Sequence, residues 1–441
     1  MGNHSHALTV EQSLAQAINN SPGLHEQFAK FQAGLAAQSG AQSEYYPQLS
    51  LRAAIGPEKT KFRSGQEIDA DLTREEVSLR ITQMLFAGMQ NVANSKRLAK
   101  EAEADRLELI AKAENLALDV TEVYLSTRKA EMDVWLTERH VKDHEDILDD
   151  VKRLAINGYA NEADVAQVSA RLANARASFI ASQNNYQDQR ASFIRIVGMA
   201  PASLVDPVAD RALLPDSLET AMEWAKQYHP QIKAAVADSQ AAQQDVRGNQ
   251  SGYYPKLYVE GVASKGDDIG GFEGKDEDYR VQLVLEWELF NGMRDVSRSR
   301  AANWRYNEAL AIRDNAEQQL FEGTRFAWNA YQSLKQQLTF LKVGVDASTL
   351  AETGYITQFK LGRRSLLDLL NAKVEVFVAR KRYLNSEYDL TQASFRLMNA
   401  TGRLGYGLRV IYPEEWDSED SETEYQDNEK NNADSTQENA S

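Results

Sequence analysis

Cysteine is absent from the 441 residues of this chain, which excludes disulfides, thiolate metal sites and a lipid anchor on an N-terminal cysteine. Long apolar runs are missing as well, so the sequence offers no transmembrane helix. The opening MGNHSHALTV lacks the apolar stretch of a signal peptide, and we expect that an export signal, if there was one, has been removed. Basic residues are too few to balance the acidic ones. The resulting net charge of −16 argues against nucleic acid as a partner.

Proline is scarce and unevenly placed. The nine prolines leave two proline-free stretches, 58–200 and 256–412. Because a proline inside a helix costs about 3 kcal/mol, these stretches are where long helices are permitted. Coiled-coil spacing runs through both stretches, at Ala113, Val120, Thr127, Val134, Val141, Leu148 and Ala155 and at Ala327, Tyr331, Leu334, Leu338, Leu341, Val345 and Ser348. A helix over 88–157 would extend about 105 Å, too long for an ordinary globular domain.

The chain also repeats itself. AQSEYYPQL at 41–49 returns as NQSGYYPKL at 249–257, and MLFAGM at 84–89 returns as ELFNGM at 288–293. Gly158 with Asp164 returns as Gly362 with Asp368. Several matches in the same order, at offsets of 208 and then 204 residues, indicate an internal duplication.

Each half therefore predicts a helix, two strands, a very long helix and a second helix. The first repeat is expected over 8–207, with strands at 48–56 and 76–86 and helices at 88–157 and 161–198. The second is expected over 208–405, with strands at 256–264 and 279–290 and helices at 292–361 and 364–402. Residues 1–7 are expected to be a disordered start. Residues 406–441 are expected to be a largely disordered acidic tail, with eleven Asp and Glu against one Lys from Glu414 onward.

The strand predictions depend on period-two alternation. In YRVQLVLEWELF at 279–290, apolar residues alternate with polar ones, and each predicted strand has about the length that crosses a bilayer. Alternation alone fits a pair of half-buried hairpins on a soluble domain equally well. Four strands have open edges that a membrane does not tolerate, and the smallest membrane barrels have about eight strands. Three copies together would supply twelve strands and close a barrel.

The predicted fold class is mainly α with a small antiparallel β part. Long coiled-coil helices would form an α-helical barrel, and four strands per chain would complete a trimeric transmembrane β-barrel of twelve strands. The hairpin loops, at 57–75 and 265–278, are rich in glycine and charge, as exposed loops should be.

These features together resemble the TolC family of outer-membrane efflux and secretion ducts, and its type I secretion branch in particular. The resemblance rests on the YYP-x-L entry to each first strand, the LF-x-G-M exit from each second strand and LGRRSLLDLLNAK at 361–373, and it covers about residues 8–405. It implies a homotrimer in the outer membrane of a Gram-negative bacterium, with the α-barrel extending into the periplasm. The partners it implies are a periplasmic adaptor of the membrane-fusion type, an inner-membrane ABC transporter, outer-membrane lipid and an exported polypeptide.

The same resemblance places a gate at the helix turns. The turns at Gly158 and Gly362, the latter with Arg363 and Ser365, would form the periplasmic tip where an adaptor docks. Arg364 matches the gate arginine, Asp164 matches its acidic partner, and Asp368 matches one of two acidic positions that constrict the pore. Three copies of Asp368 around an axis would attract cations.

This chain departs from the family pattern at two positions. Asn371 replaces the second acidic residue, which should make the constriction less blocked by cations. Phe359 replaces the gate tyrosine, which removes a hydrogen bond worth about 1 kcal/mol. The alternative for all of these residues is a charged, solvated helix turn without a gating role.

No enzyme, cofactor or metal site is expected. His140 and His144 have a spacing that can bind a metal, but HVKDH lacks the Glu of a zincin motif and lies in a charged stretch, which favours a solvated helix face. The sequence has no Walker-type phosphate loop, so energy for transport must come from a partner.

Three functions are compatible with the sequence. The favoured one is the exit duct of a type I secretion system for a large unfolded protein such as an adhesin, because no lipid-anchor cysteine is present and GLRVIYPEEW before the tail resembles adhesin-exporting ducts. A multidrug-efflux duct of the same fold is the second. A soluble periplasmic coiled-coil scaffold with β-hairpins is the third.

Overall fold

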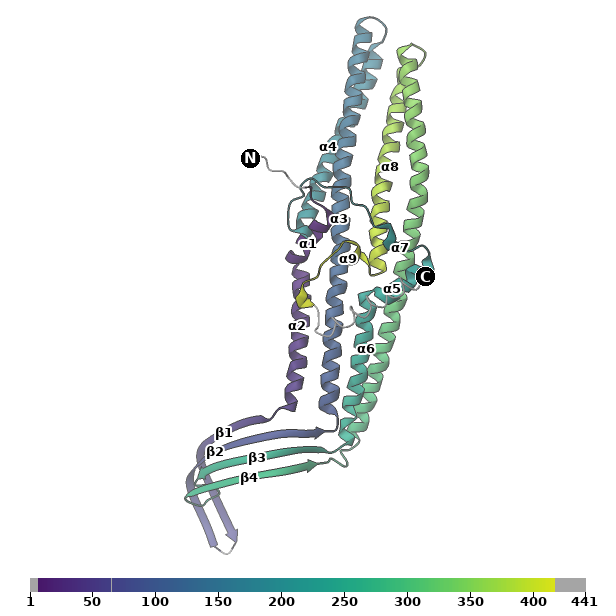
Figure 1. Ribbon diagram of the computed structural model, residues 1–441. Coiled ribbons are helices and arrows are strands. Elements are labelled where there is room, and N and C mark those ends of the chain that lie inside the picture. Colours follow the sequence, from purple (N-terminus) through teal and green to yellow (C-terminus); the bar gives the residue numbers. More distant parts are fainter. Residues whose placement is uncertain (1–6, 65, 417–441) are drawn as a thin grey trace. The chain divides into compact units, whose positions relative to one another are not determined.

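A computed structural model describes residues 7–64 and 66–416 of the chain, without the side chains of 62–70 (Figure 1). Most of the expected disordered start, 1–7, and of the expected acidic tail, 406–441, lies outside the described residues. Within the tail, residues 406–416 differ from the expectation. The chain stays packed as far as Trp416, whose side chain is buried and stacks on Tyr412.

Long helices account for most of the chain. In order, the helices and strands are α1 (Val10–Asn20), α2 (Pro22–Gln42), β1 (Gln48–Ser64), β2 (Gln66–Ala87), α3 (Gln90–Ile156), α4 (Glu162–Val197), α5 (Leu218–Tyr228), α6 (Pro230–Asn249), β3 (Lys256–Asp267), β4 (Lys275–Glu286), α7 (Arg294–Lys360), α8 (Leu366–Ala400) and α9 (Leu404–Gly407). Among the described residues, none of the helices combines the length and the apolar character needed to cross a membrane.

The described residues form two compact units. The helical unit contains the chain up to Gln27, residues 108–232 and the chain from Ala316 onward. The sheet unit contains residues 28–107 and 233–315. Each unit takes segments from both sequence repeats, so the expected repeats, 8–207 and 208–405, are not two separately packed bodies.

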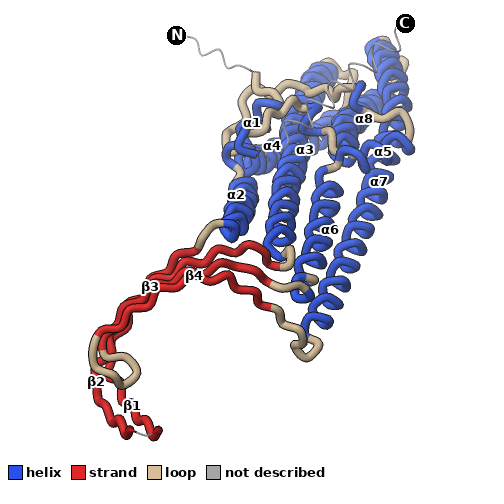
Figure 2. The backbone as a smooth tube through the Cα atoms, turned by 60° about the horizontal axis from the view of Figure 1, so that its bottom comes forward, coloured by secondary structure: helices blue, strands red, loops and turns tan. Residues whose placement is uncertain are grey.

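The sheet unit contains a four-stranded antiparallel sheet in the order β1-β2-β3-β4 (Figure 2). Its register aligns apolar residues across all four strands, for example Leu49, Ile81, Gly261 and Val281. On this face Leu51 is 71% exposed and Val281 79%, although both are large apolar side chains. Polar partners such as Arg80 and Glu260, joined at 3.3 Å, occupy the other face. One face of the sheet is therefore apolar and uncovered in the single chain.

The first hairpin is longer than the sequence suggested. Residues 57–75 were expected to be a loop, but β1 continues to Ser64 and β2 begins at Gln66. The charges that suggested a loop form ion pairs across the two strands. Lys59 Nζ is 3.9 Å from Asp71 Oδ2 directly opposite, and Arg74 Nη1 is 3.3 Å from Glu58 Oε2, its diagonal neighbour. Opposite charges across a ladder stabilise it, which composition alone does not reveal.

The fourth strand has the expected length of 12 residues but lies four residues earlier in the chain than the sequence suggested. The expected strand 279–290 is replaced by β4, which starts earlier and ends at Glu286. Glu286 pairs with Lys256, the first residue of β3, and the preceding Pro255 has no N–H to donate. The ladder therefore has no partner for Trp287 and the residues after it.

In the helical unit, the buried Tyr124 of α3 pins the segment that joins the repeats. Its hydroxyl oxygen lies 2.7 Å from the carbonyl oxygens of both Leu8 and Val205, and it accepts the Val205 N–H at 2.9 Å. The neighbouring Asp206 accepts hydrogen bonds from Arg128 Nε at 3.0 Å and from the Tyr388 hydroxyl at 2.6 Å. Side chains from α3 and α8 thus hold one short linker.

A second buried polar group, Glu114 of α3, holds the C-terminal segment. Its Oε1 accepts the Gly405 N–H at 2.8 Å and lies 3.5 Å from the Tyr412 hydroxyl. The residue is buried, with 5% of its surface exposed. Burial raises the pKa of Glu114 to about 7, and the hydrogen bonds from the backbone of Gly405 and Leu404 oppose that rise.

This carboxyl should make the C-terminal segment sensitive to pH. Because packing raises the pKa of Glu114 from 4.5 to about 7, the packed segment favours the protonated form, and that contribution is lost as the pH rises through about 7. We expect hydrogen exchange of residues 404–412, corrected for the intrinsic rate, to accelerate from about pH 5 to about pH 7 and to level off above that. Glu114→Gln should remove this dependence. An unchanged pH dependence in that variant would show that another group is responsible.

Candidate functional site

The two helix turns of the helical unit have the same backbone geometry. At the end of α3, Gly158 has φ +77° and the Tyr159 N–H donates to the Leu154 carbonyl at 2.8 Å. At the end of α7, Gly362 has φ +71° and the Arg363 N–H donates to the Gln358 carbonyl at 2.8 Å. Each is a glycine in the left-handed region that closes a helix by a six-to-one hydrogen bond. The duplication seen in sequence thus extends to the turn conformation.

The helices that follow the turns begin with matching caps. Asn161 caps α4 and exchanges hydrogen bonds with Asp164, whose N–H donates to Asn161 Oδ1 at 2.8 Å. Ser365 caps α8 and does the same with Asp368, whose N–H donates to Ser365 Oγ at 3.2 Å. Both aspartates therefore have a local role at a helix N-terminus, where a negative charge is also favoured. The spacings N-x-x-D and S-x-x-D carried this signal in the sequence.

Arg364 contacts its own turn. Its Nε donates to Gln358 Oε1 at 2.9 Å, its Nη1 lies 3.7 Å from Asp368 Oδ2, and its guanidinium carbon lies 4.5 Å from the centre of the Tyr355 ring. Within the described residues, the structure brings Arg364 to Asp368 and does not bring it to Asp164. The pKa of Asp368 is lowered, first by the hydrogen bond from the Ser365 hydroxyl and then by the nearby Arg364. Asp368 is therefore an ionised, partly exposed carboxylate beside the turn.

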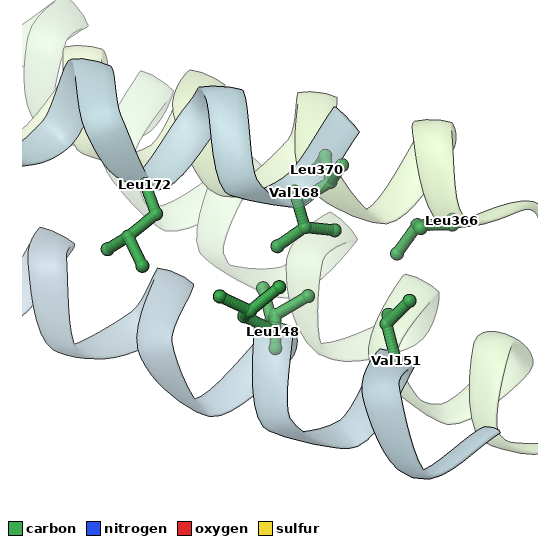
Figure 3. Packing of buried hydrophobic residues seen from close by; sticks show 7 residues of the cluster. Leu148, Val151, Val168, Leu172, Leu366 and Leu370 are labelled. Carbon is green, nitrogen blue, oxygen red and sulfur yellow. The ribbon is translucent and has the colours of Figure 1, made fainter. Parts of the chain in front are cut away.

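Phe359 belongs to an apolar cluster that joins helices of both repeats. It packs against a group of buried residues in which Leu148 and Val151 of α3 and Val168 and Leu172 of α4 meet Leu366 and Leu370 of α8 (Figure 3). Leu370 and Val168 have no exposed surface. Phe359 is itself only partly buried, and its ring adds apolar contact at the margin of this cluster.

Asn371 is exposed on α8 and accepts a hydrogen bond from Arg171 Nη2 of α4 at 3.1 Å. This bond also joins the two repeats. Arg363 and Ser365 lie at the turn itself, where both are exposed.

The expected solvated face at His140 and His144 is wrong. His144 is 1% exposed, and the His140 ring stacks on Phe377 of α8 with centroids 4.0 Å apart. Burial, followed by the charge of His144, lowers the pKa of His140 to about 4. In the described part of the chain, no three His, Cys, Asp or Glu side chains are grouped to hold a metal ion.

The sequence profile of the family described as outer membrane efflux protein matches residues 13–199 and 222–403. The chain belongs to this family. BepC of Brucella suis, an outer membrane efflux protein, is 25% identical to this efflux-family chain over 381 residues, which cover 85% of the chain and 82% of BepC. AprF of Pseudomonas aeruginosa, an alkaline protease secretion protein, is 21% identical over 401 residues, which cover 88% and 83%.

Solved structures agree with the fold. The crystal structure of CusC, described in connection with transmembrane channel formation, superposes with a TM-score of 0.78 at 16% identity and covers 89% of this chain and 92% of CusC. The expected family, fold class and outer-membrane location with a periplasmic extension are confirmed. The efflux family is one of channels and not of enzymes. Its members work in tripartite systems with periplasmic adaptors and inner-membrane transporters.

Proposed function

We propose that this chain is the exit duct of a type I secretion system, which passes a large unfolded protein such as an adhesin from an ABC transporter and a periplasmic adaptor to the cell surface. The observation that carries the duct is the sheet, in which β1 and β4 are the two edges and one face is apolar and exposed. An open edge inside lipid leaves backbone groups without hydrogen bonds, so the sheet requires neighbours. A homotrimer of twelve strands, embedded in outer-membrane lipid, satisfies every edge.

One feature favours secretion over drug efflux. A relative of this chain, AprF, is named for the secretion of a protease. Drug efflux is the second candidate, because BepC is named an efflux protein. The soluble scaffold loses its support, because a soluble protein rarely leaves so large an apolar face uncovered.

Deleting the gene in its host separates the two candidates. If the duct serves secretion, a repeat-rich adhesin should disappear from the cell surface while the inhibitory concentrations of drugs stay unchanged, and a plasmid copy of the gene should restore the adhesin. Loss of drug resistance with normal surface protein would instead favour efflux. The surface protein is measured by mass spectrometry of the peptides that a protease releases from intact cells.

We also propose that the two turns form a gate. Arg364, whose contacts in the single chain lie within the α7–α8 pair, would bond to Asp164 of the other half in the closed trimer and keep the pair inward, together with the packing of Phe359. Asp368 and Asn371 would line the constriction of the assembled trimer. The exposed turn residues, Gly158, Gly362, Arg363 and Ser365, would receive the adaptor.

Replacing Arg364 by serine tests the gate. The variant loses the ion pair with Asp368 and the contact with Tyr355, so single-channel conductance of the purified trimer in a planar bilayer should rise several-fold. Arg363→Ser, at the adjacent exposed position, should leave conductance unchanged and weaken adaptor binding. Equal conductance in Arg364→Ser and the wild type would leave the turn as a solvated surface.

The duplication supplies a matched test for the constriction. Asp368→Asn keeps the shape of the capping side chain and removes a charge, so the cation preference measured by reversal potential should decrease. Glu162→Gln removes a negative charge from the first turn of the equivalent helix, α4, and should leave the reversal potential unchanged. Equal shifts in the two variants would indicate general surface charge and not a pore lining.

A further inference from the structure

A group of three charged side chains joins three helices of the helical unit. Lys373 of α8 places its Nζ 2.7 Å from Glu352 Oε1 of α7 and 3.4 Å from Asp143 Oδ1 of α3. The side chains of Lys373 and Glu352 are 15% and 11% exposed, whereas that of Asp143 is 47% exposed. The buried pair lies within the second repeat, and the more exposed arm reaches the first repeat.

The surroundings of this group are unusually polar for a packed helix contact. His140 stacks on Phe377 of α8 and meets His144 edge-on at 4.5 Å, and His144 Nδ1 is buried without a hydrogen-bond partner. Toward the turn, the α3–α8 contact is aliphatic, with Ile147 and Leu148 of α3 in one cluster with Leu370 of α8. The charged arm from Lys373 to Asp143 adds a directional interaction to that packing.

The position of the group along α8 gives it mechanical relevance. Leu366 and Leu370 of the apolar cluster lie between it and the turn at Gly362. Farther along α8, Lys381 and Asp389 form two more ion pairs with α3. Among the described ion pairs between α8 and α3, the pair of Lys373 with Asp143 is therefore the nearest to the turn.

We propose that Lys373 is a positioning residue for closure of the duct, which holds the α7–α8 pair against α3 through Asp143. It is a second lock, separate from Arg364 and deeper in the helical wall. The inference rests on the proposed function, because only a duct has a closed state to maintain. Glu352 fixes the ammonium group, and Asp143 is the arm that has to release when the two helix pairs separate.

The energetics identify Asp143 as the residue to change. Removing Lys373 would leave Glu352 buried without a counter-charge and would endanger folding. Asp143→Asn leaves the pair of Lys373 and Glu352 intact and weakens only the arm between the repeats. Asp146→Asn is the matched control, because Asp146 pairs on the exposed surface with Lys142 of the same helix.

The first measurement is conductance of the purified trimer in a planar bilayer. We expect a several-fold rise in open probability for Asp143→Asn and wild-type behaviour for Asp146→Asn. Asp143→Glu, which keeps the charge, should restore closure. A merely structural role would lower thermal stability without this dependence on charge.

The second measurement follows the two turns directly. Since the chain has no cysteine, Ile156→Cys and Leu361→Cys introduce a unique pair of sites, which are 85% and 64% exposed in the native chain. Spin labels are attached to both cysteines. The labelled chain is diluted among unlabelled chains, so that the distance within one chain is measured. The label distance should lengthen and broaden in Asp143→Asn, and should stay at the wild-type value in Asp146→Asn and Asp143→Glu.

The two measurements separate failure of the lock from failure of the proposed function. If Arg364→Ser raises conductance while Asp143→Asn changes neither conductance nor label distance, the lock is overturned and the duct stands. If no trimer conducts but the label distance lengthens only in Asp143→Asn, the duct and its closure are overturned, and the charged arm remains only a contact that holds the two helix pairs together. An unchanged label distance in Asp143→Asn overturns the lock in every case.

Discussion

Backbone hydrogen bonding at the edges of the sheet is the constraint on which the rest of this molecule depends. A strand in lipid has no water to satisfy its free N–H and C=O groups, and β1 and β4 each present a full row of them. The apolar face, which extends over all four strands, also has to be covered, and lipid would cover it. A chain with this sheet is one part of a closed assembly, and its long helices act within that assembly.

Sequence patterns predicted the features that depend on local periodicity. Period-two alternation predicted that the segment 279–290 has one apolar face, and the repeat of Gly158 at Gly362 predicted two equivalent turns. Both follow from chain geometry that is the same wherever the segment lies. Family membership and fold class could therefore be recognised before any coordinates were available.

The errors arose where the outcome depends on a distant partner. Lys59 and Asp71 looked like loop residues because their pairing across a hairpin is invisible in composition. Lys373 and His144 looked like any other polar residue on a coiled-coil helix until the register of α3 against α8 buried them. The capping role of Asp164 and Asp368 is different, because the N-x-x-D and S-x-x-D spacings are a local signal for it. The resemblance to the family assigns these two residues only to a gate.

The end of the first hairpin is the part of the sheet whose order depends on the salt concentration. Beyond Ile55 and Glu75, where β2 stops pairing with β3, β1 and β2 continue as a ribbon of two strands, about 30 Å long at roughly 3.3 Å per residue. Such a ribbon is marginally stable in water. Dissolved salt screens its described cross-strand ion pairs, Lys59 with Asp71 and Arg74 with Glu58. The screening length of the solution falls from about 8 Å at physiological ionic strength to about 3 Å in 1 M salt. The order of this ribbon therefore depends on the salt concentration of the surrounding medium, whereas the strands of the four-stranded part are held by their neighbours.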